Sequence, residues 1–123
     1  MNNFEELEVW KLARQLRMNI SVLVKKFHSE EKYRFVDQMV RASRSVTANI
    51  AEGFGRFHFQ ENIQFCRQSR GSLTELIHHL YCAFDEELID IKQFDSLKNE
   101  IQQVLKLLNG YILYLKNAKS QTT

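Results

Sequence analysis

The sequence contains no proline and only four glycines among its 123 residues. Sandwiches and barrels join many short strands through turns, and proline and glycine are the residues that usually form those turns. Their scarcity argues against an all-β fold and favours a few long helices. A chain of this length fits one domain and can bury a sizeable core.

Cysteine is almost as scarce, since only Cys66 and Cys82 are present. They fall on one predicted helix, about 24 Å apart at 1.5 Å per residue, which is too far for a disulfide. Unpaired thiols suit a reducing compartment. The N-terminal Met-Asn-Asn-Phe-Glu-Glu is acidic where a signal peptide is basic, and no apolar run approaches the ~20 residues of a membrane span. We therefore expect a cytoplasmic protein without a membrane partner.

The formal net charge of +2 conceals an uneven distribution. Residues 41–74 carry five arginines against two glutamates, and residues 101–123 carry three lysines and no acid, whereas residues 75–100 carry seven acids against two lysines. The basic and acidic segments could attract each other across a subunit interface. The basic middle could instead bind nucleic acid, or these charges could form an ordinary solvated surface.

Apolar residues recur at spacings of three and four in four segments, which predicts helices at about 5–27, 30–52, 60–88 and 93–116. Ser29 is the expected N-cap of the second helix, before Glu30 and Glu31, and Gly53 is its expected C-terminal stop. We expect the last residues, 119–123, to be frayed. Short connections between these helices predict one domain over residues 1–123, an all-α, antiparallel up-down-up-down four-helix bundle.

Two further features concern packing. Gly71 lies inside the third predicted helix, so we expect either the close approach of a neighbouring helix or a kink there. Apolar residues also exceed what one bundle interior needs, and such an excess usually marks an oligomer interface. These residues are Val22, Val24, Val36, Val40, Phe57, Phe59, Phe65, Tyr81, Ile89, Ile91, Tyr111, Leu113 and Tyr114.

Four polar residues are candidates for a structural network between the second and third helices: Asn49, Glu52, Ser72 and Glu75. Buried polar groups are costly unless they are paired, so the network could include Arg41 or Arg70. The alternatives are a polar ligand pocket and simple surface exposure.

Five arginines are candidates for nucleic-acid binding: Arg41, Arg44, Arg56, Arg67 and Arg70. Arginine binds phosphate bidentately, and three phenylalanines, at 54, 57 and 59, lie nearby in sequence for stacking. In the alternative interpretation the arginines pair with neighbouring acids such as Glu52 and Glu61, and the phenylalanines fill an interface.

The sequence carries no pattern typical of an enzyme. Glu75 and His78 form a single Glu-x-x-His step, whereas carboxylate-bridged diiron bundles need two such steps and two further glutamates. Gly53-x-Gly55 follows a helix rather than a strand, so it is not a dinucleotide loop. No nucleophile elbow is present. We therefore expect no enzymatic activity, no cofactor and no metal.

Spaced motifs along the chain resemble a known family. They are Phe4-Glu5-Glu6-Leu7-Glu8-Val9-Trp10, then Gln38, Arg41, Ala42 and Ser45, then Asn49-Ile50-Ala51-Glu52-Gly53, then Gly71-Ser72-Leu73 with Glu75-Leu76, and finally Leu108-Asn109-Gly110 with Leu115-Lys116. Together they resemble the bacterial four-helix-bundle proteins named after intervening sequences in 23S ribosomal RNA genes. The chain departs from the family's pattern at Thr47-Ala48, where proline and serine are common, and at Phe57-His58-Phe59.

This resemblance implies a bundle that assembles as a ring, a homopentamer, without an established reaction. A related group is the accessory protein of diversity-generating retroelements, which partners a reverse transcriptase and nucleic acid. We therefore expect a self-assembling protein that binds structured RNA or DNA through its basic middle segment. The alternative is a protein-interaction scaffold, with a protein partner and no nucleic-acid role.

Overall fold

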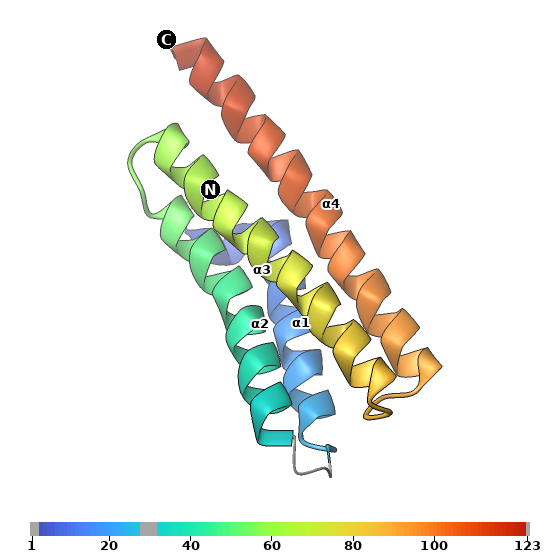
Figure 1. Cartoon of the computed structure of the whole chain (residues 1–123). Helices are drawn as coiled ribbons and strands as arrows, with labels where there is room; N and C mark the ends of the chain where they lie inside the picture. Colours follow the sequence, from blue (N-terminus) through green and yellow to red (C-terminus); the bar gives the residue numbers. More distant parts are fainter. Residues whose placement is uncertain (1–2, 28–31, 123) are drawn as a thin grey trace.

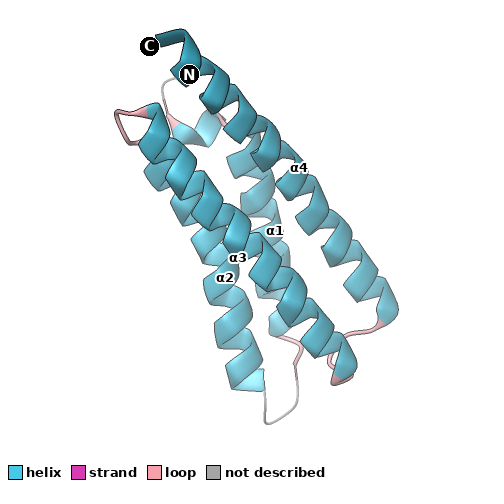
Figure 2. Ribbon diagram, turned by 45° about the horizontal axis from the view of Figure 1, so that its top comes forward, coloured by secondary structure: helices cyan, strands magenta, loops and turns pink. Residues whose placement is uncertain are grey.

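The structure is a computed structural model that describes residues 3–27 and 32–122. Four α-helices follow a short 3-10 turn, η1 (Phe4–Glu6): α1 (Glu8–Val24), α2 (Lys32–Phe54), α3 (Phe59–Asp85) and α4 (Ile91–Thr122). Each helix packs against the next, and α4 also packs against α1, so the four close around one core (Figure 1). The described residues contain helices and loops and no strand (Figure 2). The predicted antiparallel four-helix bundle is confirmed.

The core follows the predicted apolar stripes. Each helix contributes fully buried side chains to one continuous cluster, among them Leu16, Ile20, Met39, Ile50, Leu73, Leu76, Ile101 and Leu108. Burying side chains of this size stabilises the fold by about 1.5–3 kcal/mol each. Two residues that we assigned to the excess apolar surface, Val24 and Ile89, belong to this core instead.

The helix ends differ from the predicted ones for local reasons. The backbone of Leu7 is extended and separates η1 from α1, so the first helix begins at Glu8. α3 ends at Asp85 rather than near residue 88, because Glu87 adopts a left-handed conformation with φ of 63°. Asp90 and Gln93 then cap α4 reciprocally. The backbone N–H of Gln93 donates to Asp90 Oδ1 at 2.7 Å, and the backbone N–H of Asp90 donates to Gln93 Oε1 at 2.9 Å. This capping box starts α4 two residues earlier than predicted.

The expectation for Gly53 was wrong, and so was one of the two alternatives for Gly71. Gly53 does not stop α2, which continues to Phe54, and no described glycine has a positive φ. Gly71 is not a point of close approach, because a Cβ built there would meet no atom within 4 Å. The expected fraying of residues 119–122 was also wrong, since α4 continues to Thr122. The predicted cap at Ser29, with Glu30 and Glu31, lies outside the described residues.

The departure from the family pattern at Thr47 leaves α2 continuous. The Thr47 hydroxyl donates to the Arg44 carbonyl at 3.1 Å and accepts from Arg17 of α1 at 3.2 Å. Threonine therefore fits inside this helix because both its hydrogen-bonding functions are used.

Candidate functional site

The five candidate arginines do not form one surface. Arg41 and Arg44 lie on α2 and line a groove of about 550 Å³ between α2 and α3. Arg67 and Arg70 lie on the side of α3 that faces α4, where Arg70 donates to Asn109 Oδ1 at 3.2 Å. Their spacing in sequence placed each pair on one helix turn, but Arg41 and Arg44 line one groove and Arg67 lines another.

Arg56, in the α2–α3 loop, is held by its neighbours. Its guanidinium lies 2.7 Å from Glu52 Oε1 and 3.9 Å from Glu61 Oε2, and 4.8 Å from the ring centroid of Phe65. These contacts match the alternative in which arginine pairs with acids of the same chain. A guanidinium with two carboxylates is a weaker phosphate ligand than an unpaired one.

A basic groove lies between α3 and the end of α4. It has a volume of about 310 Å³ and contains two lysines that the sequence interpretation left out; its lining residues are Gln60, Ile63, Arg67, Lys116, Lys119 and Ser120. Lys119 donates to Gln60 Oε1 at 2.6 Å. Within residues 3–27 and 32–122, no carboxylate lies within 4 Å of Arg67 or Lys116. The signal available in the sequence was the absence of acids after residue 100.

The four candidates for a polar network separate into three groups. Ser45 links two of them, because its Oγ lies 3.0 Å from Asn49 Nδ2 and 2.8 Å from Ser72 Oγ. Asn49 also donates to the Ser45 carbonyl at 2.9 Å. Glu52 pairs with Arg56 at the surface instead.

Glu75 belongs to the third group. Its Oε1 lies 3.2 Å from Nε2 of His79, one turn along α3, and not beside His78. His78 Nε2 lies 3.6 Å from the Sγ of Cys82. Among the residues that the structure describes, no three His, Cys, Asp or Glu side chains are arranged to hold a metal ion.

The two thiols have different environments. Both are free; Cys66 is buried in the core, and Cys82 is half-buried near the end of α3. Loss of hydration on burial raises the pKa of the Cys66 thiol from 9.0 to about 11. The protonated thiol donates to Asn62 Oδ1 at 3.6 Å, so Cys66 is a core residue without nucleophilic character at neutral pH.

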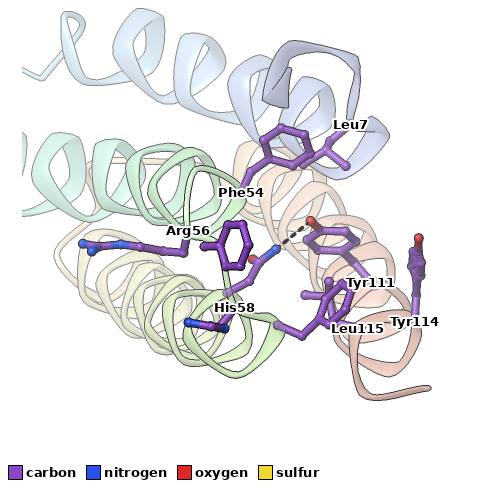
Figure 3. A pocket seen from close by; sticks show the side chains of 10 residues that line it. Leu7, Phe54, Arg56, His58, Tyr111, Tyr114 and Leu115 are labelled. Atoms are coloured by element: carbon purple, nitrogen blue, oxygen red, sulfur yellow. Dashed lines mark hydrogen bonds between the residues drawn. The ribbon is translucent and has the colours of Figure 1, made fainter. Parts of the chain in front are cut away.

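An aromatic pocket of about 380 Å³ lies at the end of the bundle that holds η1 and the α2–α3 loop. We call it the aromatic pocket below. Its lining residues are Leu7, Phe54, Arg56, Phe57, His58, Phe59, Asn62, Tyr111, Tyr114 and Leu115 (Figure 3). In the figure Arg56 extends away from the other labelled side chains. Asn62 Nδ2 donates to the Tyr111 hydroxyl at 3.1 Å. Burial raises the pKa of Tyr111 and this hydrogen bond lowers it, with a net rise.

Large apolar side chains remain exposed on several helices. They include Val22, Phe57, Tyr81, Ile91, Leu107, Leu113 and Tyr114, most of which were in the predicted excess. In the described part of the chain, no helix has both the length and the apolar character to cross a membrane.

Comparison with known proteins supports the resemblance inferred from the sequence. The family described as 23S rRNA-intervening sequence protein matches residues 5–110. A crystal structure of a protein of unknown function from the S23 ribosomal protein family of Bacteroides thetaiotaomicron is similar, with a TM-score of 0.78 and 24% identity over 85% of this chain and 97% of that chain. At this identity the likeness concerns the fold alone. No curated protein sequence matches the chain.

Proposed function

This chain belongs to the 23S rRNA-intervening sequence protein family, and on that premise we propose that it is a non-enzymatic, self-assembling cytoplasmic protein that binds structured RNA or DNA. The basic groove between α3 and α4 supplies the contact with the phosphate backbone. The observation that carries this proposal is the convergence of Arg67, Lys116 and Lys119 in one groove, with no acid after residue 100.

The geometry of the groove suits phosphate better than the surroundings of Arg41 and Arg56, which pair with acids of their own chain. Arg67 and Lys116 have no carboxylate partner among the described residues, so their charge is available to an incoming anion. Arg56, by contrast, is held by Glu52 and Glu61. Arg70, three residues after Arg67 on α3, donates to Asn109 of α4. Self-assembly would multiply the groove and raise the apparent affinity through multivalency.

Self-assembly is proposed from the exposed apolar residues of α4. Leu107 is 41% exposed and Tyr114 is 58% exposed, and they lie seven residues apart on one helical face. Apolar residues exposed in this arrangement usually mark a contact surface. The homopentameric ring remains the expected form of the assembly.

The test is binding of a fluorescent hairpin taken from 23S ribosomal RNA, and of a DNA duplex, over a series of salt concentrations. Arg67→Glu/Arg70→Glu is the variant, and Arg41→Glu/Arg44→Glu is the matched control, because it reverses the same charge on α2. Each phosphate contact contributes about one unit to the slope of log K against log salt. We expect the variant to reduce that slope by about two units, and the control to leave it unchanged.

Two results would contradict the proposal. Affinity that does not depend on salt would exclude a phosphate-binding role. Equal losses of affinity in the variant and the control would mean that the arginines of α2 and α3 contribute alike, and that binding does not depend on the basic groove in particular. Circular dichroism of both variants checks that each remains folded.

A further inference from the structure

The aromatic pocket combines rings, an unused hydrogen-bond donor and a nearby positive surface. The floor is formed by the buried side chains of Leu7, Asn62 and Leu115. Phe54, Phe59 and Tyr111 are half-buried and form its walls, and Phe57, 95% exposed, stands at its rim. A volume of about 380 Å³ is within the range of sites that bind small organic groups.

The donor is the hydroxyl of Tyr111. This oxygen accepts the hydrogen bond from Asn62 Nδ2, so its own proton is not used in that bond. No acceptor for that proton is present among the described residues. The proton stays on the hydroxyl at neutral pH, since the ordinary pKa of tyrosine is 10.0 and burial raises that of Tyr111 further. A half-buried donor without a partner favours an occupant that carries an acceptor.

The basic groove lies next to the aromatic pocket, on the other side of the contact between α3 and α4. On α4, Leu115 lines the pocket and Lys116 lines the groove. On α3, Phe59 lines the pocket and Gln60 lines the groove. Two packed helices lie about 8–10 Å apart, so one ligand that crosses this end of the bundle can reach both sites.

We propose that the aromatic pocket binds an unpaired base of a structured RNA or DNA. The base stacks on the exposed rings at the rim, and an acceptor on its edge receives the Tyr111 hydroxyl proton, while the flanking phosphates meet the basic groove. Proteins that recognise RNA commonly stack unpaired bases on aromatic side chains. Base edges present ring nitrogens and carbonyl oxygens as acceptors.

A purely apolar occupant fits these observations less well. An aliphatic or aromatic side chain from a second copy would fill the space, but it would cover the Tyr111 hydroxyl without offering it an acceptor, at a cost of about 1–3 kcal/mol. A base both stacks on the rings and offers an acceptor to the Tyr111 hydroxyl. The inference rests on the proposed nucleic-acid function and adds the feature of the nucleic acid that is recognised, which is an unpaired base.

The test compares three labelled RNA duplexes of one sequence: fully paired, with one bulged adenosine, and with an abasic residue at the bulge. Stacking of one base contributes about 1–3 kcal/mol, which corresponds to about 5- to 150-fold in affinity. We expect the bulged duplex to bind tighter than the abasic duplex by a factor in this range. Phe57→Ala should bring that ratio close to one, and Tyr111→Phe, which keeps the ring, should lower it.

The matched control is Tyr81→Ala, which removes another exposed aromatic from the other end of α3. It should leave the ratio unchanged. A ratio of one in the unmodified protein, with salt-dependent binding whose slope Arg67→Glu/Arg70→Glu reduces, overturns the base pocket and leaves the proposed function standing. No binding of any duplex overturns both. A Phe57→Ala variant that changes the oligomeric state and not the ratio assigns the pocket to a second copy of the chain.

Discussion

Gly53 and Asn62 meet where the end of α2 packs against the first turn of α3. A Cβ built on Gly53 would lie 2.7 Å from Asn62 Oδ1 and 2.9 Å from Phe65 Cβ, both shorter than van der Waals contact. Glycine is required here because the neighbouring helix leaves no space for a methyl group, and not because the backbone needs a positive φ.

Gly53→Ala should destabilise the protein. Overpacking costs about 1–3 kcal/mol, and the gain in helix propensity offsets only about 1 kcal/mol of that cost. Gly71→Ala is the matched control: its Cβ meets nothing within 4 Å, so the same substitution should stabilise α3 by up to about 1 kcal/mol. Thermal unfolding of both variants measures the difference, and equal melting temperatures would contradict the close contact at Gly53.

Ser45→Ala should cost more stability than Glu52→Ala. Ser45 joins Asn49 and Ser72 across the α2–α3 contact, and its removal deprives the half-buried Ser72 hydroxyl of its partner, at about 1–3 kcal/mol, while Asn49 keeps its bond to the carbonyl of residue 45. Glu52 has a side chain that is 56% exposed and forms a surface pair, which contributes about 0–1 kcal/mol. Equilibrium unfolding in urea ranks the two variants, and the reverse order would mean that Glu52 has a second partner in an assembled form.

Cys82 should react with a thiol reagent in the folded protein, and Cys66 only after unfolding. Titration at pH 8 should therefore give one thiol in buffer and two in urea, and Cys82→Ser should reduce the first value to zero. A second thiol that reacts rapidly in buffer would contradict the burial of Cys66.

The same burial predicts a pH dependence. The pKa of Cys66 rises from 9.0 to about 11 on folding, so the folded state favours the protonated thiol. Its contribution to stability is fully present below pH 9 and is lost as the pH rises through about 11. Cys66→Ala should reduce the loss of stability at alkaline pH. Unfolding is compared at pH 8 and pH 10.5, which span most of the interval over which the thiol titrates. An unchanged pH dependence would assign the alkaline loss to other groups.

Leu107→Glu should weaken self-association. A charge placed in an apolar contact must be desolvated, whereas the same charge in water is tolerated. Gln102→Glu adds the same charge at another exposed position of α4 and is the control. Sedimentation velocity at several protein concentrations measures the assembly. An unchanged oligomer in Leu107→Glu would exclude this face of α4 from the interface.

Local sequence patterns were sufficient to predict the four helices of this fold. The stripe that contains Leu16 and Ile20 repeats with the period of a helix, and any helix with that stripe must bury it. The start of α4 was also readable, because Asp90 and Gln93 have the spacing of a capping box, although the prediction did not use it. The end of α3 was harder, since it depends on a left-handed Glu87, a conformation that glutamate rarely adopts.

The sequence by itself determined four amphipathic helices and the basic character of residues 41–74 and 101–123. Only the tertiary structure decided which charges share a groove, because that depends on how each helix is rotated about its axis when whole faces pack together. Arg67 and Lys116 are 49 residues apart in the chain and line one groove, whereas Arg41 and Arg67 are closer in sequence and line different ones. Packing also brought Asn62 to Tyr111, and with it the aromatic pocket, through contacts that no local periodicity encodes.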